Sequence, residues 1–235
     1  MTFSVDGTTH RATAINVQHA NYAVESYSQD NDTSTEHATR LLGVHSALDG
    51  TSEQSVKTWK ELLAGIADIY NQSPLKKRQE DDGLLRVVDI FVKLTGIHSD
   101  HCAKEKKDAR LLEKEKTAAV YQSLGEDAIL GKSNEELLRA FIKARSSMIE
   151  AAGGTEQWEA LPALTQAEHE ANMMEKLVIE LGKDAYQRLS DDEKRFLKLF
   201  IWAGCGCHKD LSTARSGNHA MNYGGAKMAF LDLFC

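Results

Sequence analysis

The spacing of apolar residues changes once along this chain, and that change limits the folds that it can adopt. Residues 2–6 and 10–18 alternate apolar and polar side chains, as half-buried strands do, and 40–47 can form a third strand. Between residues 51 and 72 the apolar residues instead recur at every third or fourth position, which is typical of an amphipathic helix. The sequence therefore predicts strands first and helices afterwards.

The remaining chain continues mainly in the helical pattern. Residues 94–100 are the exception, because they read as a short strand that ends at Asp100. Polar stretches at 26–37 and 71–83 are predicted to be connections. We expect further helices at 83–93, 101–123, 134–152, 155–182 and 190–203, with Ser190 as the N-cap of the last one and with the charges of 101–123 on a solvated face. This order fits an α/β (α+β) fold that combines a partial ribonuclease H-like core with a large, mostly α-helical insertion.

The composition narrows the functional classes. A net charge of -7 argues against a wholly basic surface for nucleic acid, although a local basic strip remains compatible with it. No run of apolar residues is long enough to cross a membrane, and the first residues do not resemble a secretory signal. The four cysteines are unevenly placed, unlike those of a disulfide framework. We therefore expect a nuclear or cytoplasmic protein without a membrane partner.

Two aspartates stand at the ends of predicted strands and are candidate metal ligands. Asp6 enters the turn-like sequence Asp-Gly, and Asp100 closes the fourth strand. Carboxylates on neighbouring strands could share hard cations such as Mg²⁺ or Mn²⁺, which prefer oxygen ligands. A simpler interpretation also fits the pattern and is the more common one. Asp6 would then belong to a hairpin turn, and Asp100 would cap the following helix.

A second candidate site lies near the end of the chain, in the segment Cys205-Gly-Cys207-His208. Thiolates and imidazoles bind Zn²⁺, but this spacing is too compact for one tetrahedral site, and a second ligand pair is missing. The pattern therefore favours local packing of Cys205 against His208 over a zinc site. Nearby Lys209 and Arg215 could contact nucleic-acid phosphates, or could belong to an ordinary polar loop.

Four blocks of the sequence together resemble a known family. These blocks are SVDGTTHR (4–11), RLLGVHSALDGTSEQ (40–54), GIHSDHCAKEKK (96–107) and FIWAGCGCHKDLSTARSGN (200–218). They are similar to fungal DDE transposase-like proteins, which derive from transposable elements and have a ribonuclease H-like fold with a Cys-x-x-His element. Here Cys205 and His208 match the Cys-x-x-His element.

The resemblance implies both a mechanism and a domain division. Asp6 and Asp100 would be the first two catalytic carboxylates, holding Mg²⁺ or Mn²⁺ for cleavage and strand transfer of DNA, while Cys205 and His208 would brace the fold. Residues 1–100 would form the core, 101–203 the helical insertion, and 204–235 the Cys-x-x-His element with a truncated C-terminal end. The family also needs a third acid, usually a glutamate, but no glutamate follows Glu193. We therefore expect a truncated copy that lacks the third catalytic acid.

Two other functions remain open from the sequence alone. One is a non-enzymatic helical interaction protein, whose charged helices at 101–123 and 155–182 would contact partners. The other is a small zinc-binding module centred on Cys205, Cys207, His208 and His219. A homo-oligomer is compatible with each of these functions.

Overall fold

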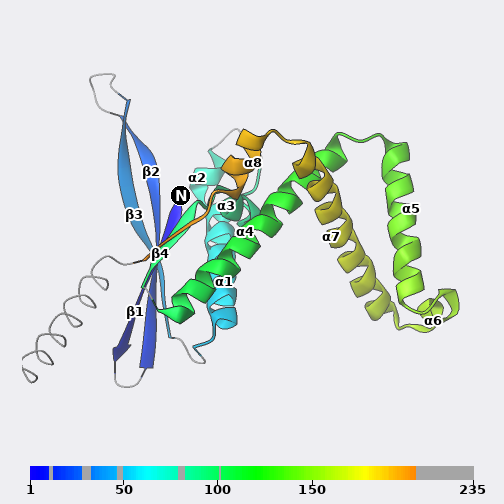
Figure 1. Cartoon of the computed structure of the whole chain (residues 1–235), viewed down its shortest axis with the longest axis horizontal. Helices are drawn as coiled ribbons and strands as arrows, with labels where there is room; N and C mark the ends of the chain where they lie inside the picture. The colour runs from blue at the N-terminus through cyan, green and yellow to red at the C-terminus, as the bar shows by residue number, and fades with distance from the viewer. Residues whose placement is uncertain (11–12, 28–32, 47–49, 79–82, 101, 205–235) are drawn as a thin grey trace, which may run out of the picture. The chain divides into compact units, whose positions relative to one another are not determined.

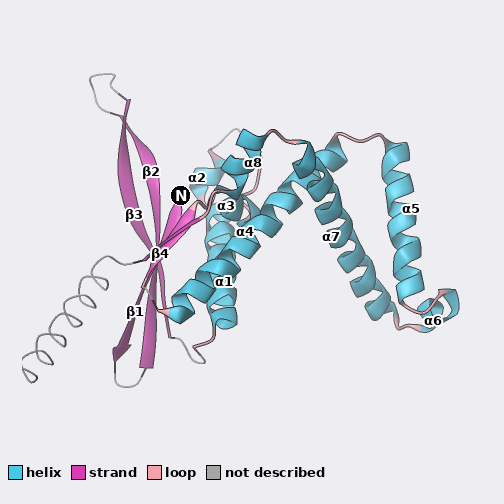
Figure 2. Ribbon diagram, viewed as in Figure 1, coloured by secondary structure: helices cyan, strands magenta, loops and turns pink. Residues whose placement is uncertain are grey.

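The computed structural model describes residues 1–204 apart from 11–12, 28–32, 47–49, 79–82 and 101. In this part of the chain, a mixed five-stranded sheet is combined with helices, so the fold is α/β (Figures 1 and 2). The strands are β1 (Thr2–His10), β2 (Thr13–Tyr27), β3 (Thr33–Ser46), β4 (Gly96–Ser99) and β5 (Ile201–Gly204). The helices are α1 (Ser52–Gln72), α2 (Pro74–Lys77), α3 (Val87–Lys93), α4 (Ala103–Leu130), α5 (Asn134–Ala151), α6 (Thr155–Ala160), α7 (Ala163–Arg188) and α8 (Asp191–Lys198).

The chain divides into two compact units. The first comprises residues 1–57, 95–111 and 200–235, and it contains the sheet. The second comprises residues 58–94 and 112–199, and it is helical in its described part. Helices α1 and α4 each contribute their first turns to the first unit and their remaining turns to the second.

The sheet of the first unit has the strand order β3-β2-β1-β4-β5. Strand β1 is antiparallel to β2 and parallel to β4, and β4 is parallel to β5. The predicted loop at 26–37 is wrong at both ends, because β2 continues to Tyr27 and β3 begins at Thr33. These two strands pair with each other beyond the part of β2 that contacts β1, so cross-strand hydrogen bonding orders a segment whose composition indicated a loop.

One face of this sheet is buried at β1 and β4. Phe3 and Ile97 are register partners on β1 and β4, and both are almost fully buried. On the same face the Trp202 indole donates a hydrogen bond to the Ser99 hydroxyl over 3.0 Å. That bond satisfies a buried polar group where β4 and β5 run side by side.

The predicted helix at 190–203 is only partly present. Ser190 caps α8 as predicted, with its hydroxyl accepting a hydrogen bond from the Glu193 amide at 3.3 Å. The helix ends at Lys198, however, and Ile201–Gly204 then forms β5. The sequence favours a helix at residues 201–203 because they are apolar and directly follow a helical pattern. In the fold, the backbone of these residues instead pairs with β4.

The predicted helix at 155–182 is interrupted, and Pro162 explains the interruption. Helix α6 ends at Ala160, and Pro162 stands at the N-cap of α7. Proline lacks a backbone N–H and disfavours helical geometry in the preceding residue. Leu161 accordingly has extended backbone angles, φ -71° and ψ 145°.

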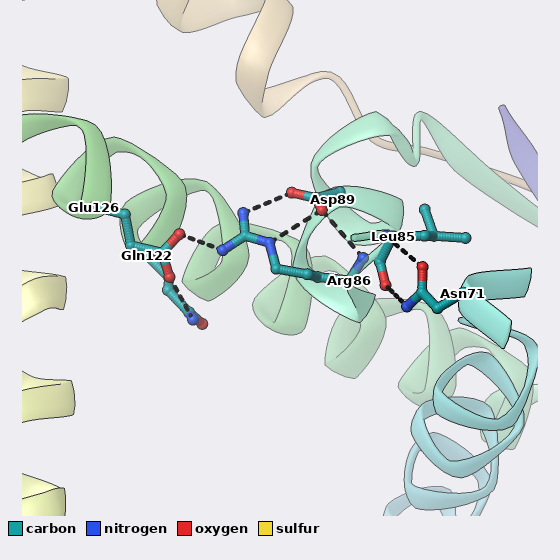
Figure 3. A network of polar contacts seen from close by, with 6 residues as sticks. All are labelled: Asn71, Leu85, Arg86, Asp89, Gln122 and Glu126. Carbon is teal, nitrogen blue, oxygen red and sulfur yellow. Dashed lines mark hydrogen bonds and ion pairs between the residues drawn. The ribbon is translucent and has the colours of Figure 1, made fainter. Parts of the chain in front are cut away.

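A polar network in the second unit anchors the segment that leads into α3 (Figure 3). Arg86 contacts Asp89 at 2.8 Å and Glu126 of α4 at 2.6 Å. The Asn71 side chain donates to the Leu85 carbonyl over 2.9 Å and accepts from the Leu85 amide over 2.8 Å. These bonds tie the chain before α3 to both α1 and α4.

The sequence predicted that the charges of helix α4 would lie on a solvated face. Two of its charged side chains are buried instead. Asp108 and Lys116 lie on its buried stripe together with Ala109 and Leu112. The Lys116 ammonium donates to the carbonyls of Val92 and Leu94, at 2.9 and 2.5 Å. The Lys116 ammonium therefore satisfies two backbone acceptors in the second unit.

Candidate functional site

Asp6 does not lie in a hairpin turn. Strand β1 continues through Asp6 and Gly7 to His10, and these two residues pair with Val17 and Asn16 of β2. The Asp6 side chain is exposed. The simpler interpretation of the Asp-Gly sequence is therefore wrong, and the carboxylate stands on a strand inside the sheet.

Asp100 directly follows β4 and does not occupy the N-cap position of α4. Helix α4 begins at Ala103, and the amide of Glu105 donates instead to the sulfur of Cys102 over 3.5 Å. The helix-cap interpretation of Asp100 is therefore not supported by these contacts. Asp100 is half-buried at the end of a central strand.

The pairing of β1 with β4 ends two residues before each of the two aspartates. Thr2 pairs with Gly96, Phe3 with Ile97 and Ser4 with His98. Extended by two residues, this parallel register would set Asp6 opposite Asp100. Neighbouring strands lie about 4.8 Å apart, and register partners point to the same face of a sheet. Side-chain alternation would then place both carboxylates on the face opposite to Phe3 and Ile97, where His98 is exposed.

Polar side chains continue across this face from β1 to β3. The Asn21 amide donates to the Ser4 hydroxyl at 3.2 Å, and the Thr39 hydroxyl donates to the Asn21 side-chain oxygen at 2.8 Å. Close by, Gln18 pairs with Gly43 and His19 with Leu41, so that Leu42 is an extra residue on β3. Such bulges locally re-aim the strand beside them, and here the bulge lies next to Val17, the partner of Asp6.

The helix that follows Asp100 adds an acidic pair that sequence reasoning missed, a half-buried Glu105 and a buried Asp108. Glu105 and Asp108 both approach the Lys104 ammonium, at 3.9 and 3.5 Å. One oxygen of each carboxylate is buried without a hydrogen-bond partner. Burial raises the pKa of Glu105, and the nearby charges of Asp108 and Asp100 raise it further. The position of Asp108 in the sequence could have indicated its burial, because it stands on the apolar stripe that Ala109 and Leu112 define.

The remaining predicted site residues lie outside the described part of the chain. These are Cys205, Cys207, His208, Lys209, Arg215 and His219. In the described part, no group of three or more His, Cys, Asp or Glu side chains is arranged to hold a metal ion. The candidate ligands near the end of β4 are therefore the two carboxylates of Asp6 and Asp100. Mg²⁺ is commonly held by one or two carboxylates and keeps its other ligands as water, so the pair suits such an ion.

None of the helices within residues 1–204, as far as they are described, is both long and apolar enough to span a bilayer. No family model, curated protein or solved structure matches the chain significantly.

Proposed function

We propose that the chain is a transposase-derived catalytic domain with a ribonuclease H-like core, which binds Mg²⁺ or Mn²⁺ between Asp6 and Asp100. The observation that carries this proposal is the parallel β1–β4 register, which would set the two aspartates opposite each other if it extended two residues beyond Ser4 and His98. The order of elements supports it: three strands, a long helix and two short ones, and then a strand inside the sheet followed by an acid.

The chemistry at this site would be hydrolysis and transesterification of DNA phosphodiesters. A divalent ion bound there supplies charge for the attacking and leaving oxygens. Asp6 and Asp100 fix its position, because each carboxylate is carried by, or directly follows, a central strand of the sheet. By resemblance, cleavage needs a third acid, so metal binding and DNA cleavage are separate properties of this chain.

Calorimetric titration with Mg²⁺ and with Mn²⁺ tests the proposal. We expect wild type to bind the ion, and Asp6→Asn and Asp100→Asn each to lose at least about tenfold in affinity, since each removes a charged oxygen ligand. Asp127→Asn is the matched control, because Asp127 is an exposed carboxylate of α4 in the second unit. An oligonucleotide cleavage assay with the same variants then shows whether the bound ion is catalytic.

Two outcomes would overturn the metal site. One is the absence of binding by the wild-type protein. The other is binding that both substitutions leave unchanged.

A second candidate function, a non-enzymatic interaction protein, is favoured by helix α5. None of its residues is buried, and it exposes Leu138, Phe141 and Ile142. Exposed apolar groups of this kind mark protein contact sites. This candidate predicts a wild-type protein that binds no divalent ion in the titration above.

A further inference from the structure

Strand β3 is the edge of the sheet next to β2. Its portion before the bulge lacks two residue types that commonly protect sheet edges against pairing with other chains. It pairs on one side with β2 and ends the strand order on the other side. Residues 33–41 precede the bulge at Leu42 and contain neither proline nor lysine, which often protect sheet edges. Between residues 35 and 41 every side chain except Ala38 is exposed. Among the described strands none pairs with this edge, so its outer backbone groups are available to another strand.

The charges on this edge cannot neutralise each other within one copy. Glu36 and Arg40 are four residues apart with no bulge between them, so they share one face of the strand. At a rise of about 3.4 Å per residue their Cα atoms are about 13.6 Å apart, too far for an ion pair. The Arg40 guanidinium instead donates to the Thr39 carbonyl, at 3.2 Å.

We propose that two copies of this chain pair through β3, antiparallel and about a two-fold axis at Ala38. In that register Glu36 of one copy lies opposite Arg40 of the other, and the symmetry makes the same ion pair a second time. Thr35 faces Leu41, and His37 faces Thr39. Directly opposite side chains have Cβ atoms about 4.5–5.5 Å apart, which is within reach for both ion pairs.

Symmetry and charge together select this register. A two-fold contact must be self-complementary, and only the axis at Ala38 sets Glu36 opposite Arg40. Moving the axis to His37 or Thr39 removes both ion pairs. Ala38, the residue on the axis, is small and leaves the close approach of the strands unobstructed. The bulge at Leu42 then ends the regular pairing, which leaves a short contact and a weak, concentration-dependent dimer.

Sedimentation velocity on the full chain tests the charge pairing. Glu36→Arg and Arg40→Glu each place like charges opposite one another twice, and each should weaken dimerisation about tenfold or more. The double variant Glu36→Arg/Arg40→Glu exchanges the charges and should restore the dimer. The double variant carries both substitutions. If it dimerises again, neither substitution by itself prevents folding.

Cysteine cross-linking tests the register independently. Ala38→Cys should give a covalent dimer on mild oxidation, because the two introduced thiols face each other. Thr35→Cys is the matched control and should not cross-link to itself, because its symmetry mate lies about 20 Å away along the strand. A mixture of Thr35→Cys and Leu41→Cys proteins should cross-link.

Three results would overturn the proposal. They are a wild-type protein that stays monomeric at all concentrations, a dimer that ignores the charge reversals, or cross-linking by Thr35→Cys alone that equals that of Ala38→Cys.

Discussion

Glu105 shows how a single buried charge can oppose folding. Its carboxylate is removed from water and lies near Asp108 and Asp100, while Lys104 only partly offsets their repulsion. One oxygen remains without a hydrogen-bond partner. The ionised form therefore costs stability at neutral pH, and the folded protein holds the Glu105 proton to higher pH than the unfolded chain does.

We expect Glu105→Gln to raise the free energy of unfolding at neutral pH by about 0.5–1.5 kcal/mol, because the neutral amide carries no desolvated charge. The pKa of Glu105 is raised above 4.5, so the cost appears as the pH rises through the folded-state pKa. Below 4.5 the carboxyl is protonated in both states, and the advantage of the variant should vanish.

Urea unfolding at neutral pH and near pH 4 measures the Glu105 effect. Glu113→Gln serves as the control, since Glu113 is an exposed carboxylate of the same helix. An equal gain for both variants, or a gain for Glu105→Gln that persists at the lower pH, would contradict the buried-charge explanation.

At the scale of elements, two glycines allow helices α4 and α7 to approach each other closely. A Cβ atom added at Gly182 would collide with the Tyr121 carbonyl oxygen, and one added at Gly125 would collide with the Val178 carbonyl. Next to this contact the rings of Tyr121 and Tyr186 pack edge to face, with centroids 5.5 Å apart. The two helix backbones can approach this closely only because both positions lack a side chain.

Gly182→Ala should therefore destabilise the protein by about 3 kcal/mol or more, because backbone, not a flexible side chain, occupies the space that the methyl group needs. Gly65→Ala is the matched control, since nothing lies within 4 Å of a Cβ placed there on helix α1. That change should stabilise by about 0.5–1 kcal/mol through helix propensity. Chemical denaturation measures both, and a neutral Gly182→Ala would show that the helices do not pack in this way.

At the scale of the whole molecule, the proposed metal site belongs to one unit only. Asp6 and Asp100 both lie in the unit formed by residues 1–57, 95–111 and 200–235. A ligand that binds only the folded form of this unit should slow its local opening. Added Mg²⁺ should therefore slow amide hydrogen exchange in β1 and β4, and leave α5 and α7 of the other unit unchanged.

Mass-spectrometric hydrogen exchange with and without Mg²⁺ provides this measurement, and Asp6→Asn should abolish the effect. Slower exchange throughout the chain would point to nonspecific ion binding instead. Slower exchange in α5 alone would place the ion in the wrong unit.

Long periodic helices were predictable because their signal is local. The pattern of 51–72 matches α1, and Ser190 caps α8 as its sequence indicated. The strand predicted at 94–100 is present as β4, although it spans only Gly96–Ser99 and Asp100 directly follows it. In each case the residues that determine the structure are neighbours in the sequence.

Other features depend on residues far apart in the sequence. The apolar residues Ile201 and Trp202 follow a helical pattern, yet they form a strand because β4 offers a parallel partner about a hundred residues earlier. The burial of Asp108 likewise depends on contacts that its charged neighbours in the sequence do not reveal.

By itself, then, the sequence determined that strands come first and helices mostly follow, and it singled out two acids worth examining, because periodicity and capping act within a few residues. Only the tertiary structure decided that Asp6 lies inside a strand, and that β1 pairs in parallel with β4, the strand that Asp100 follows. The physical reason is that strand pairing joins backbone groups across long stretches of chain, and no local pattern specifies which strands will meet.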